Sequence, residues 1–170
     1  MKIKGLTDIN FTDYKLPSLY IATPYCSFKC DKECGRAVCQ NSALATEPVL
    51  SISNTTLIQI YQANPITQAF VFGGLEPLDS SDLLDTIVEL QARAKPRRII
   101  IYTGYTEEEV LAKHSQILSL SNLVIKYGRF VPDQPTHFDP ILGVNLASPN
   151  QYAKAVSYTH LRAHETREDL

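Results

Sequence analysis

The alternation of apolar runs with helix-like segments is the feature that most constrains the fold of this chain. The apolar runs are expected to be short strands, and they cover residues 18–23, 68–72, 98–103 and 123–126. Alternation of this kind is typical of a mostly parallel sheet whose crossover connections are helices. The sequence therefore predicts an α/β fold.

The segments between these runs carry helical patterns. Residues 55–63 are expected to form one helix, and Ser80 and Ser81 can cap a second. Thr106 and Glu109 have the spacing of a capping box, which predicts the start of a third helix. The apolar face of the second helix is expected to comprise Leu83, Leu84, Ile87, Val88 and Leu90.

Cysteine, glycine or charged residues follow directly after each expected strand. The four groups are a cysteine loop, Gly73-Gly74-Leu75-Glu76-Pro77, Gly104-Tyr105 and Tyr127-Gly128-Arg129. Folds built from βα units place their ligand sites at the carboxyl ends of the strands. A closed barrel of eight such units needs about 250 residues, whereas this chain has 170. We therefore expect a partial, open βα barrel with its site at this edge.

Composition excludes several classes of protein. The chain is 44% hydrophobic, and residues 1–155 are expected to form a single domain. Its formal charge of −2 offers no polybasic face for nucleic acid. It contains no apolar run long enough to span a membrane. Cysteines confined to one loop suit a reducing compartment, so we expect a cytoplasmic protein.

All four cysteines fall within fourteen residues, at Cys26, Cys30, Cys34 and Cys39. Thiolates packed this densely are soft ligands that can converge on one metal centre. The sequence therefore predicts a metal or iron–sulfur site on the loop after the first strand.

Two other uses of the cysteines compete with this prediction. Four thiolates can complete a tetrahedral zinc site, although the spacings of three, three and four residues differ from the usual paired CxxC pattern. Disulfides would suit a small secreted domain. The opening Met1-Lys2-Ile3-Lys4 has no apolar leader, however, and the chain is long enough to bury a core without them.

The end of the chain is set apart from the domain. Residues 156–166 resemble one reading frame of a transposase-type sequencing adapter, so residues 156–170 are expected to be an artefactual tail. His160 and His164 lie in it at a helical i,i+4 spacing, and we assign them no metal.

The ordered set of motifs resembles the small radical S-adenosylmethionine (radical SAM) activases, the family that includes the activating protein of anaerobic ribonucleoside-triphosphate reductase. The resemblance spans residues 19–151 and rests on the cysteine loop, residues 73–77, residues 102–106, residues 128–130 and residues 147–151. It implies the open βα barrel of radical SAM proteins. It also implies a [4Fe–4S] cluster held by three thiolates, with SAM chelating the remaining iron.

The cysteine spacing departs from the CxxxCxxC pattern that is usual in this family. Cys26 and Cys30 keep the first spacing. Cys39 resembles the third ligand, because Asn41 follows it as in the end of the family's loop. Cys34 is then an alternative third ligand or an extra one.

The resemblance also implies cofactor contacts by Gly73, Gly74, Glu76, Tyr105, Arg129 and Asn150. Glycine backbone can approach the methionyl amino group because no side chain blocks it, and a nearby carboxylate can accept its hydrogen bonds. His114, on an expected helix, and His137, in a proline-rich loop, have no adjacent partner that indicates catalysis, so both are expected to be structural or solvated.

The implied activity is reductive cleavage of SAM, followed by removal of a hydrogen atom from a glycine of a large glycyl radical enzyme. Anaerobic ribonucleotide reductase is the expected partner, and the expected electron donor is a flavodoxin or a ferredoxin. Two alternatives remain open. The chain could be a radical SAM enzyme that modifies another peptide or a small molecule, or it could be a non-catalytic iron–sulfur or zinc module.

Overall fold

A six-stranded sheet forms the centre of the structure, a computed structural model that describes residues 1–156. The order of its strands is β10-β7-β6-β5-β3-β2. The four central strands are parallel and the two edge strands, β2 and β10, are antiparallel to their neighbours. The strands are β2 (Gly5–Asn10), β3 (Ser18–Thr23), β5 (Ala69–Gly74), β6 (Arg98–Tyr102), β7 (Leu123–Tyr127) and β10 (Tyr152–Ala155). The predicted α/β class is confirmed, and within residues 1–156 the sheet does not close into a barrel.

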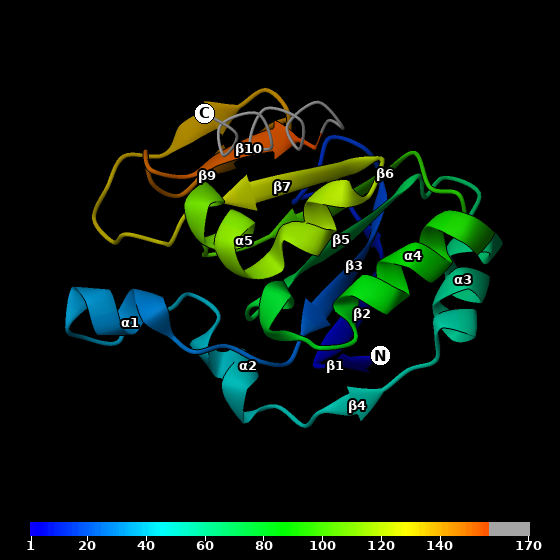
Figure 1. Ribbon diagram of the computed structural model, residues 1–170, viewed down its shortest axis with the longest axis horizontal. Coiled ribbons are helices and arrows are strands. Elements are labelled where there is room, and N and C mark those ends of the chain that lie inside the picture. The colour runs from blue at the N-terminus through cyan, green and yellow to red at the C-terminus, as the bar shows by residue number, and fades with distance from the viewer. Residues whose placement is uncertain (157–170) are drawn as a thin grey trace, which may run out of the picture.

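Three helices cover one face of this sheet, as Figure 1 shows: α3 (Asn54–Ala63), α4 (Leu83–Arg93) and α5 (Glu107–His114). The larger core lies beneath them and contains Leu19, Phe72 and Ile101 from alternate positions of β3, β5 and β6. The opposite face packs a smaller cluster around Val71 and Ile100. Because both faces are covered, the central strands are nearly continuous apolar runs.

Shorter elements complete the chain. A two-residue strand, β1 (Lys2–Ile3), pairs with β4 (Leu50–Ser51). A hairpin of β8 (His137–Asp139) and β9 (Val144–Leu146) lies against the smaller core. The remaining elements are α1 (Lys29–Cys34), α2 (Ser42–Thr46) and two 3-10 turns, η1 (Pro77–Asp79) and η2 (Ser115–Ser119). His137 was expected in a loop, but it pairs with Leu146 in this hairpin, so that prediction is wrong.

The first residues of α5 and α4 can be compared with the capping residues that the sequence predicts. The capping box of Thr106 and Glu109 is present at α5, with both reciprocal hydrogen bonds formed. At α4 the predicted helix is present, but the predicted cap by Ser80 or Ser81 is wrong, because the helix begins at Leu83 with Asp82 in the capping position. The Asp82 carboxylate makes no cap and instead accepts a hydrogen bond from the backbone N–H of Lys2. Ser80 contributes its backbone carbonyl to the Leu83 N–H.

The buried face of α4 also differs from the expected one. Thr86 is buried between Leu83 and Leu90, whereas Val88 is 48% exposed. The helix packs against both the sheet and α3, so its buried face is rotated from the one that apolar residues alone indicate. This rotation gives the buried Thr86 hydroxyl a hydrogen-bond partner, because it donates to Asn54 Oδ1 of α3 at 3.2 Å.

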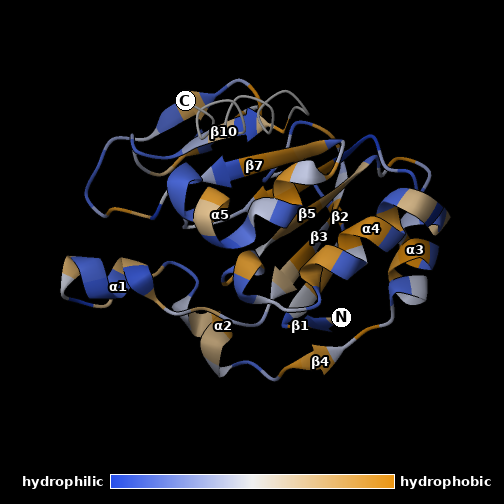
Figure 2. Ribbon diagram, in the orientation of Figure 1, coloured by the Kyte–Doolittle hydropathy of each residue, from blue (hydrophilic) through white to orange (hydrophobic). Residues whose placement is uncertain are grey.

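Residues 25–51, the cysteine segment, contrast with the sheet. None of them is buried, and neither α1 nor α2 contributes a buried side chain. Figure 1 shows α1 projecting from the body of the sheet, and Figure 2 shows it largely hydrophilic where the central strands are hydrophobic. The segment that carries every cysteine is therefore held by something other than apolar packing.

No helix among residues 1–156 is long and apolar enough to cross a bilayer. His160, His164 and the rest of the adapter-like tail after Val156 lie outside the described residues. The backbone N–H of Val156 itself donates to the Leu123 carbonyl at 3.0 Å.

Candidate metal centre

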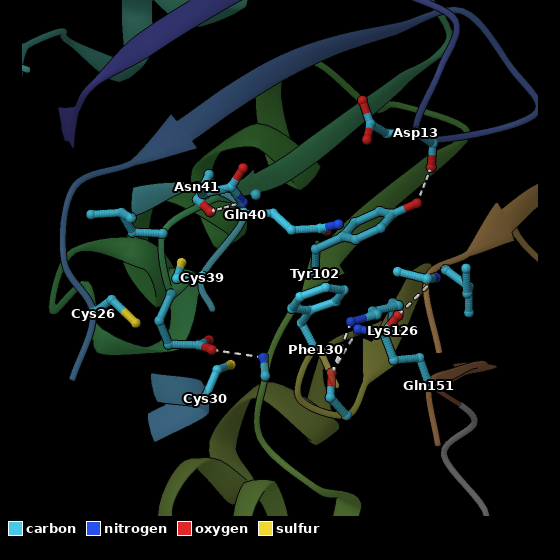
Figure 3. A pocket seen from close by; sticks show the side chains of 18 of the residues that line it. Asp13, Cys26, Cys30, Cys39, Gln40, Asn41, Tyr102, Lys126, Phe130 and Gln151 are labelled. Carbon is cyan, nitrogen blue, oxygen red and sulfur yellow. Dashed lines mark hydrogen bonds between the residues drawn. The ribbon is translucent and has the colours of Figure 1, made fainter. Parts of the chain in front are cut away.

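A cavity of about 320 Å³ lies where the carboxyl ends of the parallel strands meet the cysteine segment. Residues at or just after the ends of β5, β6 and β7 line it, among them Gly74, Gly104 and Gly128. The loop after Gly128 contributes Phe130 to a further wall (Figure 3). The β8–β9 hairpin contributes Asn145. The residues that follow separate strands in the sequence are thus brought together at one edge.

Three of the four cysteines reach this cavity. Cys26, Cys30 and Cys39 line it, and Figure 3 shows their sulfur atoms on the same side of it. Cys34, one helical turn beyond Cys30 on α1, is not part of the lining. All four are free thiols. Three soft donors that share one cavity, with space beside them, fit an iron–sulfur cluster that leaves one iron open.

The thiols are near one another without being preassembled. Within the described part of the chain, no three histidine, cysteine or acidic side chains converge closely enough to hold a metal ion. Metal binding is coupled to folding of the segment that carries the ligands, so binding can organise this loop. The exposed, core-free cysteine segment is suited to that adjustment.

Local hydrogen bonds return the loop to the cavity after α1. Phe28 adopts a left-handed conformation with φ of 50°, and its N–H donates to Cys26 Sγ at 3.2 Å. Gly35, with φ of 66°, ends α1. Asp31 Oδ1 accepts from the N–H groups of both Val38 and Cys39 at 2.8 Å. This carboxylate folds the residues between Cys30 and Cys39 into a compact bend, a role that the sequence analysis missed.

The cavity raises the pKa of two thiols. Burial raises the pKa of Cys26 to about 11, and the Phe28 N–H opposes this rise. The carboxylates of Glu76 and Asp79 raise it further. Burial also raises the pKa of Cys39. In the metal-free chain both groups are therefore protonated at neutral pH, and a metal must displace their protons to bind.

Gly73 and Gly74 end β5, where the backbone meets the cavity. Gly74 has φ of 82°, and a Cβ there would stand 2.8 Å from the Cα of Ala22 on β3. At Gly73 a Cβ would stand 2.7 Å from the hydroxyl of Tyr20. Gly74 therefore requires glycine, whereas a side chain at Gly73 would require the Tyr20 ring to move. From the cysteine segment, Asn41 Nδ2 donates to the Gly74 carbonyl at 2.6 Å.

Glu76 lines the cavity and is buried. Its Oε1 accepts from the Leu78 N–H at 3.1 Å and the Thr103 hydroxyl at 2.7 Å, and its Oε2 accepts from the Gly104 N–H at 2.8 Å. Burial raises the pKa of this carboxyl to about 7 although the three hydrogen bonds lower it. Glu76 thus joins the loops after β5 and β6 and presents a carboxyl group to the cavity.

Lys126 is a cavity residue that the sequence analysis placed only in a strand. Its side chain is buried within β7, and its Nζ donates to the Gly128 carbonyl at 2.9 Å. It forms no ion pair with a carboxylate of residues 1–156. Burial lowers its pKa to about 8. A lysine that interrupts the apolar run Leu123-Val124-Ile125 was the available signal.

Three residues that the resemblance implied as cofactor contacts lie outside the lining. The Tyr105 hydroxyl donates to Asp79 Oδ1 at 2.6 Å. Arg129 forms ion pairs with Glu109 and Glu33. Asn150 Nδ2 donates to the Arg129 carbonyl at 2.8 Å. Their roles as cofactor contacts stay predictions, and in residues 147–151 it is Ala147 and Gln151 that line the cavity.

His114 also stands apart from the cavity. It ends α5, as the sequence predicted, and its ring centroid lies 5.4 Å from that of Tyr105. Burial lowers its pKa, which favours the neutral ring that packs there.

Comparison with known protein families decides which metal group this donor set suits. A family model described as a 4Fe-4S single cluster domain matches residues 18–146. The chain belongs to that family. The matched range includes all four cysteines and the four parallel strands, so membership supports a 4Fe–4S cluster as the metal group. The chain matches none of the curated proteins and none of the solved structures with which it was compared.

Proposed function

We propose that this 4Fe-4S single cluster domain is a radical SAM enzyme that generates a glycyl radical on a partner enzyme. The observation that carries the proposal is the composition of the cavity. It combines three free thiols with one buried carboxyl, at Glu76, and one buried ammonium, at Lys126. A cluster, together with the amino and carboxylate groups of SAM, would match these groups.

Each lining group has a proposed role. Cys26, Cys30 and Cys39 would hold the cluster, which supplies one electron when it is bound and reduced. Glu76 would accept hydrogen bonds from the amino group of SAM. Lys126 would bind its carboxylate, because this ammonium is the cavity's cation whereas Arg129 is turned toward Glu109 and Glu33. The backbone carbonyl and N–H groups of Gly73 and Gly74, at the end of β5, would lie close to the methionyl end of SAM.

With one electron from a flavodoxin or a ferredoxin, the cluster held by Cys26, Cys30 and Cys39 would supply reductive cleavage of the bond between sulfur and C5′ of SAM. The products would be methionine and, after removal of one hydrogen atom from a glycine Cα of the partner, 5′-deoxyadenosine and a glycyl radical.

The size of the cavity supports a partner as the source of that hydrogen. Small-molecule sites have volumes of about 300–1,000 Å³, and this cavity lies at the low end with about 320 Å³. A cavity of this size that holds a cluster and SAM would have little space left for a second small molecule. A second substrate would have to enter as a loop of another chain, and anaerobic ribonucleotide reductase is the expected partner. The parallel sheet would then correspond to the open βα barrel of radical SAM proteins.

The test is anaerobic reconstitution with iron and sulfide, followed by addition of SAM and dithionite. We expect about four iron atoms for each chain, release of methionine, and a glycine-centred doublet in the electron paramagnetic resonance spectrum when the anaerobic reductase from the same source is added. SAM cleavage without a radical on the reductase would move the function to another peptide or small-molecule substrate. Zinc alone, with no SAM cleavage, would sink the enzymatic proposal.

A further inference from the structure

The helix that carries Cys30 adds no side chain to the hydrophobic core, and its first residue, Lys29, places Nζ 4.4 Å from the centroid of the Tyr105 ring. None of the six residues of α1 is buried, and the helix is too short to be stable alone. Something else must set where its thiol stands, and the charges of α1 are the candidates.

Two oppositely charged residues of α1 face two oppositely charged residues of the sheet body. Lys29 and Glu33 are four residues apart and therefore lie on one face of the helix. Lys29 Nζ lies 3.2 Å from Glu109 Oε1, and Glu33 Oε1 lies 3.0 Å from Arg129 Nε. Arg129 Nη2 joins the two pairs by donating to Glu109 Oε1 at 2.7 Å. The four charges alternate in sign along the contact.

Arg129 and Glu109 have further contacts with the body of the protein, although Arg129 Nε itself makes no hydrogen bond within residues 1–156. The Arg129 side chain is only 10% exposed, and its carbonyl accepts from Asn150 Nδ2. Glu109 Oε2 accepts from the Thr106 N–H in the capping box of α5, so its carboxylate is held from two sides. Arg129 holds the pKa of Glu109 down to about 2, which keeps the carboxylate charged at all physiological pH values. Arg129 and Glu109 thus present one positive and one negative charge to α1.

We propose that Arg129 and Glu109 are positioning residues that dock α1 through Glu33 and Lys29, and so set the place of the Cys30 thiol at the cavity. Cys30 follows Lys29 directly and precedes Glu33 by three residues, so the docked turn of helix encloses it. The catalytic importance of this docking rests on the proposed function, whereas the placement of the thiol is independent of it.

The test measures Cys30 in the metal-free, full-length chain. Iodoacetamide labelling followed by peptide mapping gives separate alkylation rates for Cys26, Cys30, Cys34 and Cys39. The test variant is Lys29→Gln/Glu33→Gln, which removes both contacts and leaves the net charge of α1 unchanged. A second variant, Lys29→Glu/Glu33→Lys, keeps the composition and makes both contacts repulsive.

The matched control is Arg36→Gln. Arg36 of the cysteine segment pairs with Asp133, which lies outside that segment, and the two side chains are 64% and 85% exposed. Glu33 is also exposed, at 60%, but its partner Arg129 is only 10% exposed, so the Arg36 pair is expected to contribute less. Circular dichroism and thermal melting check that each variant keeps the sheet.

We expect the alkylation rate of Cys30 to rise about fivefold in the double Gln variant, and further in the charge-exchanged one, with Arg36→Gln unchanged. The wild-type rate should also rise as salt increases from about 0.1 M to about 1 M, where the screening length falls from about 10 Å to about 3 Å. The double Gln variant should not respond to salt. Equal Cys30 rates in wild type and both double variants would overturn the proposal. Wild-type protein that assembles no cluster would count against the proposed function alone, since alkylation needs no metal.

Discussion

The sheet and the cysteine segment of this protein are stabilised in opposite ways. Every residue of β5 and β7 is buried, whereas no residue between 25 and 51 is. The sheet gains its free energy from apolar area removed from water. The cysteine segment depends on hydrogen bonds and ion pairs, such as Asn41 to the Gly74 carbonyl and Glu33 to Arg129. A segment with few buried contacts opens locally at low free energy, which suits a loop that must admit a metal group.

The largest effect should be loss of the cluster with the fold intact. We expect Cys26→Ala, Cys30→Ala and Cys39→Ala each to abolish SAM cleavage and most of the bound iron, because thiolates are the ligands. The thermal midpoint of the metal-free chain should hardly change, since the cysteine segment contributes nothing to the core. Cys34→Ala is the control and should keep its cluster. Iron retained in Cys39→Ala but lost in Cys34→Ala would reverse the assignment of the third ligand.

The next largest effect tests the sheet side of the comparison. Phe72→Ala should lower the free energy of unfolding by about 3–5 kcal/mol, as a fully buried aromatic truncation does. Phe72 is 0% exposed in β5. Leu50→Ala in β4 should change it by less than about 0.5 kcal/mol, because surface positions contribute little and Leu50 is 51% exposed. Urea unfolding followed by circular dichroism measures both free energies of unfolding. A similar decrease for the two variants would contradict the conclusion that the sheet and the cysteine segment are stabilised differently.

A smaller effect is expected where the sheet meets the cavity. Gly74→Ala forces a side chain into a left-handed backbone and against Ala22, so we expect a loss of about 1–3 kcal/mol of stability. Loss of SAM binding would accompany it without identifying a cofactor contact. Gly104→Ala is the control, since its Cβ would come no nearer than 3.5 Å to Glu76. A Gly74→Ala protein as stable as wild type would show that β3 can move away from position 74 without loss of stability.

The smallest effect concerns the buried cation of the cavity. Lys126→Met should weaken SAM binding about tenfold, as loss of a hydrogen bond to a charged group does, with iron content unchanged. Isothermal titration of the reconstituted protein measures the affinity. An unchanged dissociation constant would remove Lys126 from the cofactor site.

The same variant tests the pH dependence of stability. The pKa of Lys126 falls from 10.5 to about 8 on folding because burial disfavours the ammonium. Below pH 8 Lys126 is protonated in both the folded and the unfolded chain, so the full free-energy cost of burying its ammonium destabilises the folded state. Between pH 8 and about 10.5 the unfolded chain binds more protons, so wild-type stability should rise with pH relative to Lys126→Met. A constant difference across this range, measured by urea unfolding, would contradict a buried ammonium.

Sequence patterns that extend over only a few residues predicted much of the fold. The apolar runs became β3, β5, β6 and β7, and the spacing of Thr106 and Glu109 produced the capping box of α5. The strand-end residues met at one cavity because parallel strands end at the same edge of a sheet. The clustered cysteines indicated the iron–sulfur group that family membership supports.

Contacts between distant segments were decided by the tertiary structure. Arg129 faces α1 and α5 rather than the cavity, Lys126 faces the cavity, and Val88 faces solvent. No local pattern distinguishes these outcomes, because the partner of a charged or apolar side chain depends on which element packs beside it.

The sequence by itself determined the alternating elements, the edge at which they present a site and the thiol ligands available there, because each depends on neighbours along the chain. Only the tertiary structure decided that Cys30 and Cys39 reach the cavity while Cys34 does not, and that Glu109 and Arg129 meet α1 across its charged face. The physical reason is that a segment without buried residues takes its position from single directional contacts. Those contacts exist only after the sheet and its helices are assembled.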